Sequence, residues 1–172
     1  MTTTTQDTRK EELLAGAESK YGFVPNLLRQ LSTSTAALEL YTQGQATLSA
    51  EGSRLSGKER NLVQLTVSEI NDCGYCKAAH SAIGRMDGVD SSVLAAVSAG
   101  QSIEASEGGD YVAAARLLIE KQGHLSGEDL ARLEKQGIDR EVLFEIIGSI
   151  AIKTVSNWVN HIARTKVDAE FS

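Results

Sequence analysis

The sequence predicts an all-α fold, a compact multi-helix bundle of about seven to nine helices. Three observations lead to this prediction. Apolar residues recur at a spacing near 3.6 residues along most of the 172-residue chain, the connections between periodic segments are short, and the chain has one proline. A protein built from many β-turns uses more prolines, and no segment has the alternating pattern of a strand.

Breaks and capping residues divide the first half of the chain into five expected helices. The first helix begins at about Glu11 and ends at the break formed by residues 21–26. The next four helices are expected over residues 27–31, 35–48, 57–70 and 73–85. Ser34 or Thr35 can cap the third helix, and Ser56 with Glu59 has the spacing of a capping box for the fourth.

Four more helices are expected in the second half. They cover residues 91–99, residues 111–122, a segment that begins after Leu125-Ser126-Gly127, and residues 139–162. Asp90 or Ser91 can cap the first of these, Gly123 ends the second, and Ser126 opens the third in the way that Ser56 opens its helix. The last segment is a long apolar helix that closes the fold.

Composition predicts one domain and excludes several classes of protein. Residues 1–8 are rich in threonine and are expected to be a disordered N-terminus, and residues 9–172 are expected to form a single all-α domain. The net charge of -6 argues against a nucleic-acid binder and against a protein that binds anionic membranes. Without a run of about 18 apolar residues or an apolar N-terminal stretch, the expectation is a cytoplasmic protein whose thiols are reduced.

The most informative stretch is residues 73–80, CGYCKAAH. Cys73, Cys76 and His80 are spaced by three and then four residues, so on one helix their side chains fall within an arc of roughly 60°. Thiol redox chemistry requires such a pair, because the thiolate is the nucleophile and the second sulfur must reach the first. The helix N-terminus and the imidazole of His80 both favour the thiolate.

The pair of thiols predicts a two-step oxidation. A thiolate that cleaves a peroxide O–O bond becomes a sulfenic acid, the second thiol converts it to a disulfide, and an external dithiol reduces that disulfide. We assign Cys76 as the attacking thiol, because it is one helical turn from His80, and Cys73 as the resolving thiol. The opposite assignment stays open, since in many CxxC motifs the more N-terminal sulfur is the more acidic one.

The cysteines admit two other interpretations. They could be two small buried apolar side chains, although the presence of His80 one turn further on weakens this reading. A zinc site would combine them with two of the three histidines, His80, His124 and His161. The chain has no second CxxC and no HxxxH pair, so we predict no metal, and without a nucleotide, flavin or haem motif we predict no cofactor.

Several motifs together resemble a known family. They are residues 67–80, VSEINDCGYCKAAH, the upstream stretches YGFVPNLL at 21–28 and LSGKER at 55–60, and Asn157 with Asn160 near the end. The sequence is similar to the alkylhydroperoxidase D-like (AhpD-like) branch of the carboxymuconolactone decarboxylase family. The resemblance implies an all-α fold, peroxidase activity through the two cysteines, and a homo-oligomer, commonly a trimer or hexamer. The decarboxylase branch lacks the cysteine pair.

The sequence departs from the family pattern at one position. The family's proton relay usually includes a glutamate twelve residues before the first cysteine, and this position here is Asn61, which cannot exchange a proton. We expect Glu69, four residues before Cys73, to replace it in the relay, provided that the helix continues through residues 71–72. Tyr75, between the two cysteines, is the candidate substrate-binding residue through its phenol.

These observations favour one function and leave three alternatives. The leading hypothesis is a thiol-dependent peroxidase that reduces hydrogen peroxide or alkyl hydroperoxides in antioxidant defence. Its expected partners are the peroxide and an external dithiol reductant, a thioredoxin-like or lipoyl-bearing protein. The alternatives are a dithiol redox sensor, a disulfide oxidoreductase without efficient peroxide turnover, and a carboxymuconolactone decarboxylase-like enzyme whose activity would survive loss of both cysteines.

Overall fold

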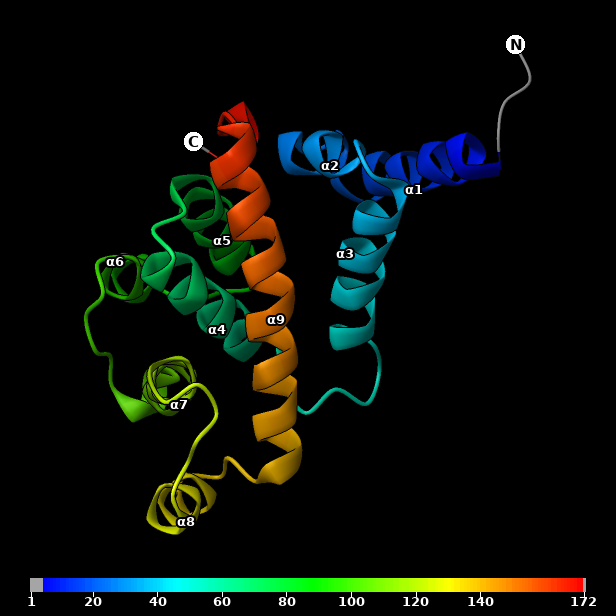
Figure 1. Ribbon diagram of the computed structural model, residues 1–172. Helices are drawn as coiled ribbons and strands as arrows, with labels where there is room; N and C mark the ends of the chain where they lie inside the picture. Colours follow the sequence, from blue (N-terminus) through cyan, green and yellow to red (C-terminus); the bar gives the residue numbers. More distant parts are fainter. Residues whose placement is uncertain (1–4, 172) are drawn as a thin grey trace.

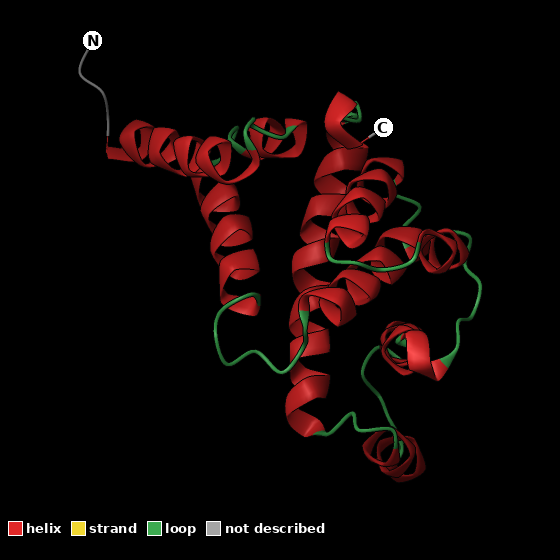
Figure 2. Cartoon of the chain, turned by 180° about the vertical axis from the view of Figure 1, so that it is seen from behind, coloured by secondary structure: helices red, strands yellow, loops and turns green. Residues whose placement is uncertain are grey.

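The structure, a computed structural model, describes residues 5–171. Within these residues the chain consists of helices and loops without a strand (Figure 2), which confirms the all-α prediction. The α-helices are α1 (Thr5–Tyr21), α2 (Asn26–Leu31), α3 (Thr35–Leu48), α4 (Gly57–Ile70), α5 (Gly74–Met86), α6 (Ser91–Ser98), α7 (Gly109–Glu120), α8 (Gly127–Lys135) and α9 (Arg140–Ala163). Two short 3-10 helices that the sequence did not predict are η1 (Ala105–Glu107) and η2 (Ala169–Phe171).

The first helix begins earlier than the sequence pattern predicts. Residues 1–4 lie outside the described residues, so the disorder expected for residues 1–8 can be compared only from Thr5 onward, where the chain is already helical. Asp7 lies in the first turn and pairs with Lys10 at 3.7 Å. A carboxylate in the first turn complements the positive end of the helix dipole, which favours the longer helix.

The capping residues predicted from the sequence are confirmed. Ser34 accepts a backbone hydrogen bond in the first turn of α3, and Ser56 forms a reciprocal capping box with Glu59 at the start of α4. Ser126 and Asp129 form a second capping box at the start of α8. These bonds satisfy backbone N–H groups that a helix start leaves without partners, and they involve only neighbours in sequence, so a sequence pattern can locate them.

Helix α9 is the centre of the bundle. It lies between α3 on one side and the group of α4, α5 and α7 on the other (Figure 1). Two glycines let α3 and α9 approach closely, since a Cβ at Gly44 would overlap Ile152 and a Cβ at Gly148 would lie 3.2 Å from Leu48. This approach places Tyr41 of α3 against the inward face of α9.

The inward face of α9 is polar, although the helix as a whole is apolar. Among the described residues α9 is the one helix long and apolar enough to cross a membrane by length and hydropathy alone. Its buried polar side chains are Ser149, Lys153, Ser156, Asn157 and Asn160. This polar face packs against other helices of the bundle, so α9 contributes to the core of the fold.

Candidate functional site

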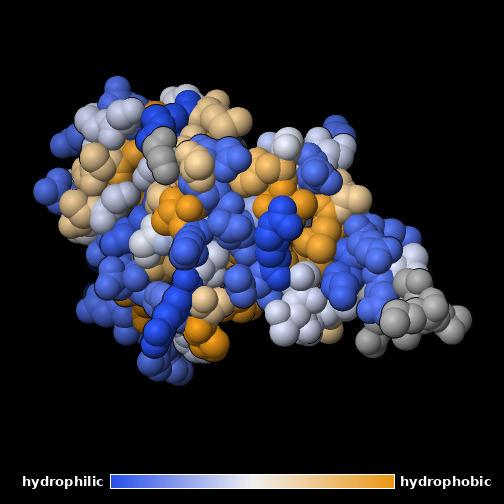
Figure 3. Space-filling view, turned by 90° about the horizontal axis from the view of Figure 1, so that it is seen from above, coloured by the Kyte–Doolittle hydropathy of each residue, from blue (hydrophilic) through white to orange (hydrophobic). Residues whose placement is uncertain are grey.

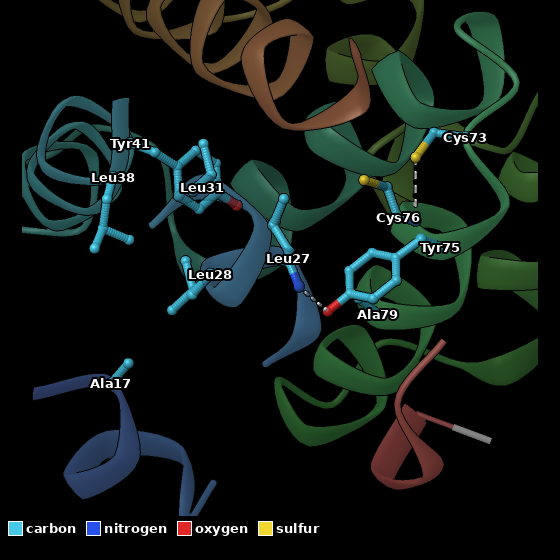
Figure 4. Close-up of a cluster of buried hydrophobic side chains, with 10 residues drawn as sticks. All are labelled: Ala17, Leu27, Leu28, Leu31, Leu38, Tyr41, Cys73, Tyr75, Cys76 and Ala79. Carbon is cyan, nitrogen blue, oxygen red and sulfur yellow. Dashed lines mark hydrogen bonds between the residues drawn. The ribbon is translucent and has the colours of Figure 1, made fainter. Parts of the chain in front are cut away.

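Cys73 and Cys76 lie at the beginning of α5. Helix α4 ends at Ile70, and Asp72 adopts a positive φ of 47°, so the chain turns and Cys73 becomes the N-cap of α5. The Cys73 sulfur accepts a hydrogen bond from the backbone N–H of Cys76 at 3.4 Å (Figure 4). Both thiols are free and interact with each other, so the predicted dithiol is formed in its reduced state.

Two asparagines of α9 contribute amides to the site. Asn160 directs Nδ2 toward both sulfurs, at 3.1 Å from Cys76 and 3.8 Å from Cys73. Asn157 accepts a hydrogen bond from Asn71 at 2.9 Å. This bond holds the Asn157 amide beside the turn that connects α4 to α5. Hydrogen-bond donors favour a thiolate over a thiol, so these amides favour negative charge at the sulfurs.

The two sulfurs share their protons unequally. A hydrogen bond from the Cys73 thiol and, to a smaller extent, the charge of Lys153 lower the pKa of Cys76 to about 5 against the opposing effect of burial. The same interaction between the sulfurs, together with burial, raises the pKa of Cys73. At neutral pH Cys76 is therefore the thiolate and Cys73 the thiol. This electrostatic difference supports Cys76 as the nucleophile.

A buried lysine lies next to the imidazole. Lys153 of α9 is 2 % exposed, and its Nζ lies 2.6 Å from Nε2 of His80. Burial, followed by the charge of Lys153, holds the pKa of His80 well below its usual value, so the ring is neutral. An ammonium group only donates hydrogen bonds, so Nε2 of His80 is the unprotonated nitrogen and the ring proton lies on Nδ1.

The charge of Lys153 is sustained by its neighbours. Burial disfavours the ammonium, but Tyr41 and the cysteine sulfurs outweigh that effect and raise the pKa of Lys153 above its ordinary value. The helical spacing predicts that the imidazole of His80 contacts the Cys76 thiol directly. The ring nitrogens of His80 instead contact Lys153 and Asn61, so the histidine is linked to the sulfur through the lysine.

Asn61 contacts the other nitrogen of the imidazole. Its Nδ2 lies 3.4 Å from Nδ1 of His80, and its side-chain oxygen has no partner. Turning the amide over brings the oxygen to the Nδ1 proton and satisfies both groups. Asn61 therefore orients His80 but does not exchange a proton with it.

One protein family has a sequence model that matches this chain. Residues 35–120 match the model of the carboxymuconolactone decarboxylase family. The matched segment is half of the chain and contains Asn61, both cysteines and His80. The chain belongs to this family.

Solved structures share this family member's fold over nearly its whole length. An uncharacterized peroxidase-related protein from Silicibacter sp. TM1040 has 22% identity and a TM-score of 0.81, over 98% of this chain and 89% of that one. A peroxidase-related protein with an alkylhydroperoxidase AhpD core from Ralstonia eutropha JMP134 has 19% identity and a TM-score of 0.83, over 99% and 93%. The debrominase Bmp8 has 20% identity and a TM-score of 0.75, over 98% and 90%. No curated protein matches the sequence. These structural similarities establish that the chain has the AhpD-like fold.

Glu69 of this AhpD-like chain lies apart from the imidazole. Its carboxylate pairs with Arg116 of α7 at 2.9 Å. The end of α4 at Ile70 and the turn at Asp72 interrupt the helical periodicity that would have placed Glu69 on the face of the cysteines. The structure therefore does not bring Glu69 together with His80. Among the described residues, the ring nitrogens of His80 contact Asn61 and Lys153 instead.

The Tyr75 hydroxyl is occupied by protein groups. It donates to Asp168 at 2.6 Å and accepts from the backbone N–H of Leu27 at 3.3 Å. Burial, followed by Asp168, raises the pKa of Tyr75, so the phenol stays protonated. Figure 4 shows its ring directed toward Leu27 and away from the sulfurs. The phenol thus ties α5 to α2 and to the C-terminal segment, and the structure does not point it toward a substrate at the sulfurs.

The zinc interpretation gains no support from geometry. His124 and His161 are both exposed, whereas the two cysteines are buried. Within residues 5–171 no group of three or more His, Cys, Asp or Glu side chains is arranged to hold a metal ion.

Lys153 is the functional candidate that sequence reasoning missed. Its signal was available, because it is a single basic residue in the middle of a long apolar helix. It is also four and seven residues before Asn157 and Asn160, so all three share one helical face. The motifs that resemble the family include Asn157 and Asn160 of this helix but not Lys153, and the matched family segment ends at residue 120.

The AhpD-like site is closed in this structure. Cys73 is 1% exposed and Cys76 is 0% exposed, and Leu27 and Phe171 belong to the apolar cluster that encloses them. Figure 3 shows the end of the molecule formed by α1, α2 and the C-terminal segment, where hydrophilic and hydrophobic side chains both cover the surface. A hollow of about 290 Å³ between α7 and α8 shares no lining residue with the site. A substrate therefore reaches the sulfurs only when covering segments move.

Proposed function

We propose that this protein is a thiol-dependent peroxidase that uses Cys76 as the nucleophile and Cys73 as the resolving thiol. The observation that carries the proposal is the pairing of two free, buried thiols at the start of α5, where a hydrogen bond from the Cys73 thiol lowers the pKa of Cys76. The Asn160 amide at 3.1 Å adds a donor to the sulfur that must be ionised. Membership of the carboxymuconolactone decarboxylase family and the likeness to peroxidase-related structures support the same reaction class.

The proposed cycle has three steps. The Cys76 thiolate attacks one oxygen of a hydroperoxide, the O–O bond breaks, Cys76 becomes a sulfenic acid, and the other oxygen leaves as an alcohol or water after taking up a proton. The Cys73 thiol then attacks the Cys76 sulfur, forming the disulfide and releasing water. An external dithiol reduces this disulfide by two exchange steps and is itself oxidised to a disulfide.

The reductant and the setting follow from the same chemistry. A disulfide between two buried sulfurs is reduced by a reagent that presents a thiol on an extended arm or loop, so we propose a thioredoxin-like or lipoyl-bearing protein as partner. A cytoplasmic location, where thiols are kept reduced, is part of the proposal and accords with two free cysteines.

A turnover assay tests the function. The reduced protein is mixed with hydrogen peroxide or tert-butyl hydroperoxide in the presence of excess dihydrolipoamide, and peroxide consumption is followed. We expect many equivalents of peroxide to be consumed per protein chain. Consumption of one equivalent only would contradict turnover and favour the redox-sensor alternative.

Two parallel measurements, of lactone decarboxylation and of bromide release, test activities that are named for relatives. A lactone decarboxylase activity that survives replacement of both cysteines would contradict the proposal. A structural neighbour was solved as a cysteine-to-alanine variant of the debrominase Bmp8 in complex with 2,3,4-tribromopyrrole, so this compound is included as a substrate. Cysteine-dependent release of bromide without peroxide consumption would replace the peroxidase assignment.

We also propose that the chain forms a homo-oligomer through the outward face of α9. Five apolar side chains lie within a narrow arc of that face, opposite the buried polar residues: Phe144, Ile147, Ala151, Trp158 and Ile162. Phe144 and Trp158 are each 61% exposed and Ile162 is 86% exposed, an apolar surface that a second copy of the chain would cover.

Replacing Trp158 with glutamate tests this surface. A charge in the centre of the apolar face is expected to lower the molecular mass of the particle to that of the single 18.4 kDa chain, measured by sedimentation. Lys10→Glu, on α1, introduces the same charge away from this face and is expected to leave the mass unchanged. A wild-type protein that is already monomeric would contradict the proposal.

A further inference from the structure

Lys153 is a buried cation without a carboxylate partner. It is 2% exposed, and none of the ion pairs within residues 5–171 includes it. Its Nζ donates to His80 Nε2 at 2.6 Å, and it also interacts with Tyr41. Neither of these partners is a carboxylate. An isolated buried ammonium costs several kcal/mol, so the charge requires an anion nearby.

The titratable groups that face Lys153 identify this anion. They are Tyr41 from α3, Cys76 and His80 from α5, and Cys73 at the N-cap of α5, while Asn61 of α4, beside His80, is uncharged. His80 is neutral and accepts a hydrogen bond from the lysine. A thiol ionises more readily than a phenol, with ordinary pKa values of about 8.5 and about 10. Of the two sulfurs, Cys76 has the shorter contact with the Asn160 amide.

We propose that Lys153 is the counter-ion of the Cys76 thiolate and the source of the proton that the leaving oxygen of a cleaved peroxide takes up. The counter-ion role stands on the packing of α9 against α5. The proton-transfer role rests on the proposed peroxidase function. Together they assign to a cation of α9 the part that a carboxylate at the position of Asn61 would otherwise perform.

The proton is released at the step that needs it. When the Cys76 thiolate forms its S–O bond, the sulfur becomes neutral and Lys153 loses the anion that holds its charge in a buried site. The ammonium then becomes a stronger acid because burial favours the neutral amine. Its proton passes to the departing alkoxide or hydroxide as the O–O bond breaks, which leaves sulfenic acid, alcohol or water, and a neutral Lys153.

The remaining steps return the proton. The Cys73 thiol attacks the Cys76 sulfenic acid, and its proton leaves with the hydroxyl group as water. Reduction of the disulfide by an external dithiol delivers two protons, of which one returns to the Cys73 thiol and one to Lys153, as the Cys76 thiolate is restored. The cluster is electrically neutral in every state, which a buried site with few charges requires.

The first test uses no peroxide, so it fails or succeeds independently of the proposed function. The thiolate of the reduced protein is titrated by its absorbance at 240 nm, and alkylation of Cys76 by iodoacetamide is followed against pH. In Lys153→Met we expect the midpoint to rise by about one pH unit, the lower end of the usual effect of losing an opposite charge, because the hydrogen bond from Cys73 remains. An unchanged midpoint in a variant that is folded by circular dichroism would overturn the proposal.

A second variant separates the two roles of the lysine. Lys153→Arg keeps the charge but holds its proton far more tightly, because a guanidinium has a pKa above about 12. We expect its thiolate midpoint to stay near that of the wild type while its reduction of tert-butyl hydroperoxide slows at least about tenfold. Equal peroxide rates at a pH where both proteins are thiolates would overturn the proton-transfer role. If Lys153→Arg does not fold, the same comparison is made with Lys153→Met above its own midpoint.

Lys77→Met is the matched control for these measurements. Lys77 lies one residue after Cys76, but its side chain reaches outward and pairs with the exposed Asp72 at 3.2 Å. Its removal changes the net charge by the same amount as removal of Lys153. We expect both the titration midpoint and the peroxide rate to be unchanged, and an effect equal to that of Lys153→Met would show that the lysine acts only through the overall charge.

Discussion

Cys76→Ser is expected to abolish peroxide consumption, with a rate at least about a thousandfold below that of the wild type. The serine hydroxyl remains protonated where the Cys76 thiol, with a pKa lowered to about 5 by the Cys73 hydrogen bond, is ionised. A hydroxyl cannot attack the O–O bond at a comparable rate. The rate of peroxide loss in the presence of a dithiol measures the effect.

Cys73→Ser is expected to behave differently and is the matched comparison. The Cys76 sulfur can still attack once, so we expect one equivalent of peroxide to be consumed and a sulfenic acid to accumulate, detectable by mass spectrometry after trapping. Cys73→Ala removes the donor altogether and should raise the midpoint of the Cys76 titration, because the hydrogen bond from Cys73 is the largest cause of its low pKa. Sulfenic acid on Cys73 of the Cys76→Ser variant would instead identify the N-terminal sulfur as the nucleophile.

The pH dependence has a definite direction. The thiolate fraction of Cys76 increases as the pH rises through about 5, so the rate of the first step should already be near its plateau at pH 7. A free thiol with a pKa of about 8.5 would still be gaining reactivity there.

Asp168→Ala is expected to expose the sulfurs and increase the rate at which they are alkylated. Asp168 is buried, accepts from the Tyr75 hydroxyl at 2.6 Å and accepts from the backbone N–H of Asn26 at 3.1 Å. Hydrogen bonds to a charged group are worth about 1.5–3 kcal/mol each, so opening of this segment should become roughly 10 to 100 times more frequent. The rate of Cys76 alkylation by iodoacetamide at pH 7 measures this opening.

Glu170→Ala is the control for the C-terminal segment. Glu170 is an exposed carboxylate two residues from Asp168, so its removal should leave the alkylation rate unchanged. Tyr75→Phe removes one of the hydrogen bonds to Asp168 and keeps the packing of the ring against Phe171, so we expect a smaller increase. If Asp168→Ala leaves the alkylation rate unchanged while the protein stays folded, the path to the sulfurs lies elsewhere.

Local chemistry made much of the fold predictable. The capping boxes at Ser56 and Ser126 and the N-caps at Ser34 and Asp90 depend on residues two or three positions apart, which a sequence displays directly. The boundaries expected for the helices agree closely with the structure except at the N-terminus, where α1 begins at Thr5. Helix ends lacking such signals depend on charge and packing beyond the local pattern.

The candidate site was predictable only in part. Cys73 and Cys76 were found because their spacing on one helix turn is a local property, and the structure brings their sulfurs together. Glu69 was placed by assuming a continuous helical period, which the turn at Asp72 interrupts. Tyr75 lies between the two cysteines in the sequence, but its side chain is held by Asp168, which is 93 residues further along the chain.

The sequence by itself determined the helical class, the helix starts and the dithiol at the beginning of α5, because each of these depends on residues within a few positions of one another. Only the tertiary structure decided what surrounds the sulfurs. Packing of α9 against α5 places Lys153 on His80, a partner 73 residues away, and Asn160 on Cys76, 84 residues away. Contacts over such distances arise from the burial of whole helix faces, and no local pattern of residues encodes which groups those faces bring together.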